Sequence, residues 1–334
     1  YLTDWNTLYD IDTYKESRAD ENNFEKVFKG AMSVSFPYDL DKLKDLNDGY
    51  DILKETPFGN NLTTDFVFSA IENEGLGLDS FTDVLTISYS STDYIGHNFG
   101  VDSKETQDAY LRLDLEIERL LDYLDKNIGE NEYLLFLTAD HGASKIPAYL
   151  NSIGVKSKNV EDKELDVALN NILISEFGSE RLVSKIVNNQ IYINDLAVES
   201  LGLNYNEVQE KIINFLNDLD FIDGVYTSEE IINGTYEEGY KLLIQNGFNT
   251  ERSGDIIFKF HENVIKYGNR GTTHGSGYSY DTHVPLIFFG KNIVQGESEI
   301  RTKITDIAPT VVKLMGLKDM NDSTGDVLTF VIQN

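Results

Sequence analysis

Cysteine is absent from this chain of 334 residues, and histidine is scarce, with five copies. Without cysteine the chain can form no disulfide, offers no thiolate nucleophile and cannot bind zinc through sulfur. A metal ion would therefore have to be bound by His, Asp, Glu or backbone groups. The redox state of the compartment is left open.

Long apolar runs are also missing. The longest runs have the length of a strand, far short of the roughly 20 residues of a membrane helix, and no basic-then-apolar signal segment opens the chain. We therefore expect no membrane insertion. With 40% hydrophobic residues, the chain is long enough for one large domain with an insertion, or for two domains.

Basic residues are few, because 28 Lys and Arg face 57 Asp and Glu, which gives a net charge of −29. This field repels polyanions and argues against nucleic acid as a partner. An anionic small substrate, such as a phosphate ester, would have to be attracted locally, by bound cations.

Three of the five histidines lie in short patterns with an acid, and these patterns are Asp93-x-x-x-His97, Asp140-His141 and Asp281-x-His283. Acids are so common here that the histidines carry the inference. A neutral imidazole beside carboxylates is a typical ligand set for a divalent metal such as zinc. The patterns therefore predict a metallohydrolase.

The first two patterns each follow an apolar, strand-like run, at residues 84–89 and 133–137. Between them, residues 104–128 carry apolar side chains at helical spacing. A strand, a crossover helix and a second strand predict two parallel strands, with Asp93 and Asp140 at one edge of one sheet. The third pattern instead precedes its apolar run.

Residues 151–265 differ in character and predict a small α+β insertion, with strands near residues 190–193 and 256–260 and a helix between them. It contains His261, which no acid pattern surrounds and for which a structural or surface role is expected. The remaining residues, 1–150 and 266–334, are expected to form an α/β core whose mostly parallel sheet is flanked by helices.

Two further helices are expected from their capping residues. Thr64 and Asp65 are good N-cap types and predict a helix that runs to about residue 73. Thr305 and Asp306 predict a second helix that ends at Gly316, so Asp306 is expected to be a cap and not a ligand.

Several separate segments resemble the alkaline phosphatase superfamily, and within it the bacterial PafA-type phosphate-irrepressible alkaline phosphatases. These segments are "TPFGNNLTTDF", "TISYSSTDYIGHNFG", "FLTADHGAS", "DTHVPLIFFG" and "KITDIAPTVVKLMG". They occur in the family's order over most of the chain. The resemblance implies the fold of that superfamily.

The resemblance also implies a site with two zinc ions. Asp93, His97 and His283 would bind one ion, and Asp140 and His141 would contribute to the other. His274 lies in a glycine-rich loop before the third pattern, and contact with substrate, contact with the ligands or a purely structural role are all open for it.

The family's nucleophile, its remaining aspartate ligand and its phosphate-binding cations would lie before residue 1, so they are expected to be missing. The chain opens on Tyr1 in aromatic-rich sequence, as the C-terminal part of a longer enzyme would. Thr63 and Thr64 are interpreted as capping residues and not as nucleophiles.

The function that follows is hydrolysis of small phosphate monoesters through a phosphoenzyme, in the periplasm or outside the cell. The alternatives are another activity of the superfamily, namely phosphodiesterase, sulfatase or phosphonate hydrolase, or a non-catalytic remnant that binds metal. Whether this chain alone is active is left open by its sequence.

Overall fold

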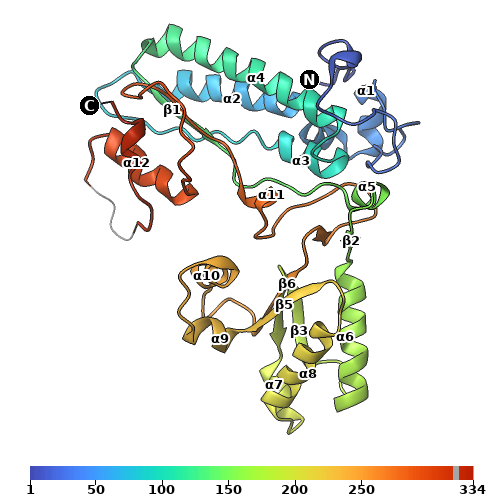
Figure 1. The fold of residues 1–334 in the computed structure, drawn as a ribbon. Helices are drawn as coiled ribbons and strands as arrows, with labels where there is room; N and C mark the ends of the chain where they lie inside the picture. The colour runs from blue at the N-terminus through green and yellow to red at the C-terminus, as the bar shows by residue number, and fades with distance from the viewer. Residues whose placement is uncertain (319–322, 334) are drawn as a thin grey trace.

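The chain folds into an upper part, which holds both ends of the chain, and a lower lobe built from its middle, as the computed structural model of residues 1–318 and 323–333 shows (Figure 1). Helices α2 and α4 lie side by side along the top of the upper part. Its helices are α1 (Leu40–Leu43), α2 (Phe58–Glu74), α3 (Ser91–Phe99), α4 (Lys104–Leu124), α5 (Pro147–Ser152), α11 (Ser279–Thr282) and α12 (Ile307–Leu314).

Helix α4 confirms the helix predicted for residues 104–128. The last residues of the predicted range continue it as a π-helical turn, Asp125–Gly129. It begins where the Ser103 hydroxyl accepts a hydrogen bond of 3.0 Å from the amide of Thr106. A serine at this position satisfies one of the free amides of the first turn. No helix in the described part of the chain is long and apolar enough to cross a membrane.

Helix α2 begins at Phe58, six residues before the predicted capping residue Thr64. Pro57 precedes it with φ −60°, which suits the first turn of a helix. Thr64 is buried within the helix, and its hydroxyl donates to the carbonyl of Asn60 at 3.2 Å. The prediction that Thr64 caps this helix is therefore wrong, because the proline sets an earlier start.

An aromatic core fills the upper part beside α3. Trp5, Tyr38 and Phe99 are almost fully buried, and their rings lie 5.5 to 6.0 Å apart, centroid to centroid. Ile95 of α3 belongs to the same cluster. This packing fixes the helix that carries Asp93 and His97.

The sheet of the upper part differs from the prediction. Strand β1 (Leu134–Thr138) pairs with β8 (Leu286–Gly290), and the two strands are antiparallel. Residues 84–89 are not in a strand, and Val84 is 71% exposed. The parallel pairing expected between residues 84–89 and 133–137 is therefore not formed, since residues 84–89 form no ladder with any strand of the described residues.

The lower lobe has a core of its own, made of buried side chains between Val160 and Val264. Its four-stranded sheet has the order β3-β4-β6-β5, with antiparallel neighbours, and the strands and helix predicted within residues 190–260 are present. The elements of this segment are β2 (Lys158–Asn159), α6 (Asp162–Phe177), β3 (Val183–Val187), β4 (Gln190–Ile193), α7 (Asp195–Ser200), α8 (Tyr205–Asn217), β5 (Ile222–Thr227), α9 (Ser228–Asn233), α10 (Gly239–Gly247), β6 (Ile256–Phe260) and β7 (Val264–Ile265).

The chain enters and leaves the lobe at one place. Strands β2 and β7 are parallel neighbours, with Lys158 opposite Val264 and Asn159 opposite Ile265. In Figure 1 this pair lies at the junction of the lobe and the upper part. The two chain ends that would remain if the lobe were deleted are therefore neighbours, and the upper part would stay one continuous unit.

Near the C-terminus, Asp306 directly precedes α12, but its side chain makes no capping hydrogen bond to that helix and instead bonds to the start of the 3-10 turn before it, so the predicted cap of α12 is wrong. Its buried carboxylate accepts hydrogen bonds from the amides of Lys303, at 2.8 Å, and Asp326, at 2.9 Å. A 3-10 turn, Ile304–Asp306, leads into α12, and Gly316 follows that helix with φ +68°.

Candidate metal centre

Helix α3 carries two of the predicted ligands on one face. Asp93 and His97 are four residues apart, so their side chains project from successive turns of the helix. The Nε2 atom of His97 lies 3.4 Å from a carboxylate oxygen of Asp93. Both side chains are half-buried.

His141 lies on the turn that follows β1. Its Nδ1 atom is 2.9 Å from the carbonyl oxygen of Gly142. The amide of Gly142 in turn donates to the carbonyl of Asp281 at 2.7 Å. A Cβ atom on Gly142 would lie 2.1 Å from the carbonyl oxygen of Tyr280, so only glycine fits between these two loops.

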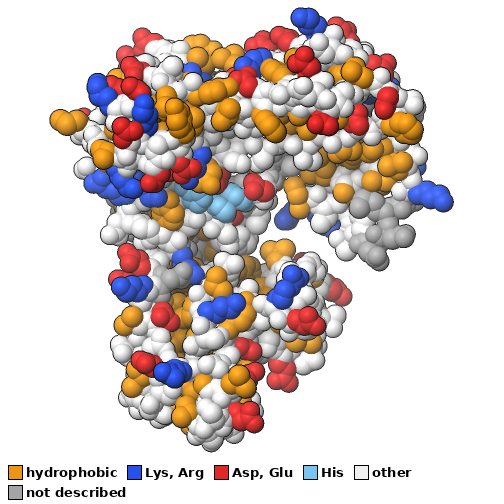
Figure 2. Space-filling model, turned by 180° about the vertical axis from the view of Figure 1, so that it is seen from behind, with side chains coloured by type: hydrophobic (Ala, Val, Ile, Leu, Met, Phe, Trp, Pro, Cys, Tyr) orange, Lys and Arg blue, Asp and Glu red, His pale blue; other side chains and the backbone are white. Residues whose placement is uncertain are grey.

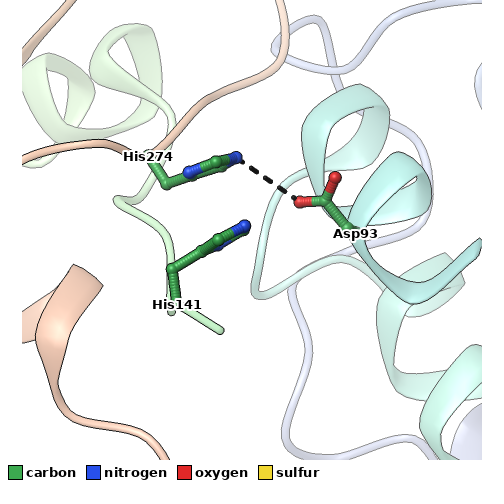
Figure 3. A group of neighbouring side chains, drawn as sticks. All are labelled: Asp93, His141 and His274. Carbon is green, nitrogen blue, oxygen red and sulfur yellow. Dashed lines mark ion pairs between the residues drawn. The ribbon is translucent and has the colours of Figure 1, made fainter. Parts of the chain in front are cut away.

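His274 comes from the loop before α11 and stacks on His141, with ring centroids 3.3 Å apart and planes at 11°. Its Nε2 atom lies 3.8 Å from Asp93. Figure 3 shows both imidazoles facing the carboxylate of Asp93 across the space between their loops and α3. Ligand atoms of Asp93, His141 and His274 all lie within 4.8 Å of one another, the one such group found among the described residues.

His97 flanks this cluster, with its ring centroid 5.1 Å from that of His274. Its Nδ1 atom is 2.7 Å from the carbonyl of Thr272, and the amide of Thr272 donates to the carbonyl of His97. The Thr272 hydroxyl donates to the carbonyl of Ser144 at 2.8 Å. The fully buried Thr272 thus ties α3 to the turn that carries His141.

These backbone contacts select the tautomers of two imidazoles. In His97 and His141 the Nδ1 atom faces a carbonyl oxygen, which can only accept, so Nδ1 must carry the proton. The Nε2 atom keeps its lone pair whenever the ring is neutral. In His97 the hydrogen bond with Asp93 raises the pKa of the ring, and in the protonated form Nε2 donates to the carboxylate. A backbone carbonyl on the far nitrogen is the usual partner of a metal-binding histidine.

The pKa shifts favour the ligand forms of two members of the cluster. Burial opposes ionisation of Asp93, but the hydrogen bond with His97 and the neighbouring imidazoles lower the pKa of its carboxyl below the usual value. Burial, together with the nearby His141, lowers the pKa of His274. Asp93 is therefore an anion and His274 a neutral imidazole near pH 7.

Two of the predicted ligands, Asp140 and His283, do not belong to the cluster of Asp93, His141 and His274. The Asp140 side chain is 89% exposed and lies 3.6 Å from Nε2 of His141. His283 is exposed at the end of α11 and is not part of the cluster. His274, for which the sequence left several roles open, belongs to the cluster, and its place in the loop of Gly271 to Gly277 was the available signal.

The donor set fits a divalent metal. One carboxylate oxygen from helix α3 and two imidazole nitrogens from two separate loops, all half-buried, form a donor set of the kind that zinc binds in catalytic sites. Pale-blue histidine side chains are visible at the surface of the upper part in Figure 2. A small molecule can therefore reach them.

Comparison with known proteins identifies the family of this chain. The sequence profile of the family described as type I phosphodiesterase / nucleotide pyrophosphatase matches residues 8–284. This chain belongs to that family. The resemblance to the alkaline phosphatase superfamily is thereby confirmed.

Individual relatives are similar along the whole chain. The chain is 40% identical to a protein of Myroides odoratus named calcium-transporting ATPase, and 36% identical to the alkaline phosphatase PafA of Elizabethkingia meningoseptica. These matches cover 100% and 98% of the chain but 61% and 60% of the relatives, so the chain spans about three-fifths of their length.

A solved structure of wild-type PafA has the same fold. It matches 99% of the chain with a TM-score of 0.93 at 34% identity, and the match covers 63% of that structure. The α/β fold of the alkaline phosphatase type, with helices flanking the sheet, is therefore confirmed.

Proposed function

We propose that this chain forms the metal-binding part of a zinc-dependent hydrolase of phosphate monoesters. The observation that carries the proposal is the convergence of Asp93, His141 and His274, three residues far apart in the sequence, on one half-buried point. The similarity to the alkaline phosphatase PafA supports this substrate class over others.

Asp93, His97 and His274 are the residues we assign to one zinc ion, and Asp140 and His141 to a second. The distances of 3.4 and 3.8 Å from Asp93 to the imidazoles of His97 and His274 support the first group. His274 replaces His283 in this assignment because His283 lies outside the cluster. Bound zinc would polarise a phosphate ester and stabilise the charge that develops on its oxygens.

The residues of this chain orient the metal-binding imidazoles and offset the positive charge of the site. The backbone carbonyls of Thr272 and Gly142 keep the Nε2 atoms of His97 and His141 available, and the carboxylate of Asp93 offsets the cationic charge of the site. Because the protein carries a net charge of −29, attraction of an anionic ester has to come from this local centre.

In the proposed mechanism the phosphoenzyme forms on a serine or threonine hydroxyl. The hydroxyls of Thr63 and Thr64 donate to carbonyls one turn earlier in α2, at 3.0 and 3.2 Å. We therefore assign the nucleophile to the part of the fold that the chain does not span, which is about two-fifths of the relatives. A periplasmic or secreted location belongs to the same proposal and rests on the family resemblance.

The lobe of residues 151–265 is assigned the role of a cap beside the site, next to a core of residues 1–150 and 266–334. It contributes no member of the cluster, yet it contacts the His274 loop, because the Tyr278 hydroxyl donates to the carbonyl of Phe260 at 2.9 Å. Insertions at such an edge often set which substrates are accepted.

A chimera tests the proposed function. In it, this chain replaces the part of Elizabethkingia PafA that it matches, so that the remaining two-fifths are supplied by the relative. We expect the zinc-loaded chimera to hydrolyse p-nitrophenyl phosphate faster than bis(p-nitrophenyl) phosphate or p-nitrophenyl sulfate, with the optimum at alkaline pH. Asp93→Ala should remove nearly all of this activity.

The chain alone, assayed beside the chimera, should turn over p-nitrophenyl phosphate little faster than zinc in buffer, because positioning and covalent catalysis are missing. A folded chimera that prefers the diester or the sulfate would reassign the substrate class. Ordinary enzymatic rates from the chain alone, lost on Thr63→Ala or Thr64→Ala, would show that the nucleophile lies within it.

A further inference from the structure

Asp281 is a buried carboxylate that the proposed metal site does not use. It lies in the short helix α11 and is 4% exposed. One of its oxygens, Oδ2, accepts three hydrogen bonds, from the amide of Gly275 at 3.0 Å, the amide of Ser276 at 2.7 Å and the hydroxyl of Ser276 at 2.6 Å. The two donor residues, Gly275 and Ser276, directly follow His274 in the sequence.

The same residue also contacts the loop that carries His141. The carbonyl oxygen of Asp281 accepts the 2.7 Å hydrogen bond from the amide of Gly142. At this point the two loops are as close as they can be, because a Cβ atom on Gly142 would clash with the backbone of Tyr280. Asp281 therefore joins the segments on which the two stacked imidazoles lie.

The other carboxylate oxygen, Oδ1, is inaccessible to solvent and has no hydrogen-bond partner among the described residues. A buried charged group with an unsatisfied oxygen lowers stability, so packing alone gives no reason for an acid here. Because all three bonds are made by Oδ2, an asparagine with its amide nitrogen at the Oδ1 position could make them too.

We propose that Asp281 is a positioning residue for the metal centre: through Oδ2 it shapes the loop of His274, and through its carbonyl it holds that loop against His141. The pair of imidazoles is then preorganised before metal binds. This inference rests on the proposed metal site for its functional meaning, but the loop geometry that it explains exists without metal.

Cobalt(II) and amide exchange test the proposal in the intact chain. We expect Asp281→Ala to lower the affinity for Co²⁺ about 10- to 100-fold, the usual effect of losing a residue that orients a metal ligand, and to change the visible absorption spectrum of the bound ion. In the metal-free chain the amides of Gly275 and Ser276 should exchange faster. Asp281→Asn should retain the wild-type spectrum and an affinity within roughly threefold, because it can keep the three bonds.

Asp306→Ala is the matched control, because Asp306 is equally buried, at 4%, and also accepts backbone amides, but does so beside α12. It should lower stability and leave the Co²⁺ spectrum unchanged. If Asp281→Asn lowers the affinity for Co²⁺ as much as Asp281→Ala does, the proposal is overturned, since the charge of Asp281 and not its hydrogen bonds would then be required.

A different result would show that the proposed function, and not the role of Asp281, is wrong. If the wild-type chain binds no Co²⁺, the metal site is wrong, while amide exchange at Gly275 and Ser276 still decides whether Asp281 shapes the loop. Unchanged exchange at both amides in Asp281→Ala would contradict the positioning role directly.

Discussion

Single buried polar residues hold much of the upper part together, and Asp108 of α4 is one of them. Its fully buried carboxylate accepts hydrogen bonds from the indole of Trp5 at 2.8 Å, the amide of Leu8 at 2.6 Å, the hydroxyl of Tyr14 and the guanidinium of Arg112 at 2.7 Å. One residue thus attaches the N-terminal segment to the helix.

Asp108→Ala should therefore cost about 3–5 kcal/mol of unfolding free energy, the usual loss when one partner of a buried ion pair is removed. Urea unfolding followed by the fluorescence of the single tryptophan, Trp5, measures it. The exposed Asp114 of the same helix is the control, and Asp114→Ala should change stability by less than about 0.5 kcal/mol. Equal effects of the two substitutions would refute this assignment.

At the same scale, the site shows what single residues in a sequence can and cannot predict. Asp93, His97 and His141 could be recognised because each stands in a short pattern with an acid or a partner. The same kind of pattern pointed to His283 as a ligand and left the role of His274 open. The cluster contains His274 and not His283, because membership depends on how the loop before α11 folds. That fold is set by contacts of Thr272 and Asp281 with residues more than a hundred positions away.

At the scale of elements, α4 introduces a buried acid into its first turn. Glu105 is fully buried, and burial, together with the charge of Glu25, raises the pKa of its carboxyl well above the usual value. Burial likewise raises the pKa of Glu25 to about 7. Both carboxyls are therefore more basic in the folded chain than in the unfolded chain.

The consequence is a loss of stability as pH rises. Above the ordinary pKa of about 4.5 the folded state binds more protons than the unfolded state, so the free energy of unfolding falls with pH until both acids are ionised. We expect Glu105→Gln, which cannot ionise, to lose less stability than wild type between pH 5 and pH 8. Urea midpoints at the two pH values measure this difference.

Glu118→Gln, on the exposed side of α4, should behave as wild type in the same experiment. It removes one charge without removing a buried carboxyl. A pH dependence that Glu105→Gln and Glu118→Gln reduce equally would mean that general charge repulsion, and not burial of Glu105, is responsible.

Helices were more predictable than strands. The apolar spacing of residues 104–128 is a local property and gave α4 correctly, and Ser103 supplied its cap. The run at residues 84–89 has the composition of a strand but is not one here, because a strand also needs a neighbour. Pairing partners are a property of the whole fold, and the PafA structure contains a further 37% that this chain does not match.

At the scale of the whole molecule, the upper part exposes apolar side chains on its two-stranded sheet. Phe136 of β1 is 40% exposed, and Ile287 and Phe289 of β8 are 54% and 47% exposed. Orange side chains also cover part of the upper body in Figure 2. The lobe, in contrast, encloses its own core, so we expect that it can be deleted without unfolding the upper part.

Replacing residues 160–263 with a short Gly-Ser linker should therefore leave the metal centre in place. The ends to be joined are neighbours in the β2–β7 pair, and no member of the cluster lies in the removed segment. We expect bound zinc at the wild-type stoichiometry and, in the chimera with PafA, an altered preference among p-nitrophenyl and alkyl phosphates.

The fluorescence of Trp5 shows whether the upper part is still folded in that deletion, because Trp5 is fully buried there. Loss of zinc with native tryptophan fluorescence would show that the lobe contributes ligands. An unchanged substrate preference would remove its role as a cap.

Asp93, His141 and His274 converge on one centre, and we propose that this centre binds divalent metal ions, with Asp93 and His274 as ligands of one ion and His141 as a ligand of the second. Zinc affinity of the chain, measured by competition with a chromophoric chelator for wild type, His274→Ala and His283→Ala, tests it most directly. We expect His274→Ala to weaken binding by at least about 100-fold, since losing even a residue outside the ligand shell costs about 10- to 100-fold, and His283→Ala to bind as wild type does. Weaker binding in His283→Ala with unchanged affinity in His274→Ala would contradict the claim.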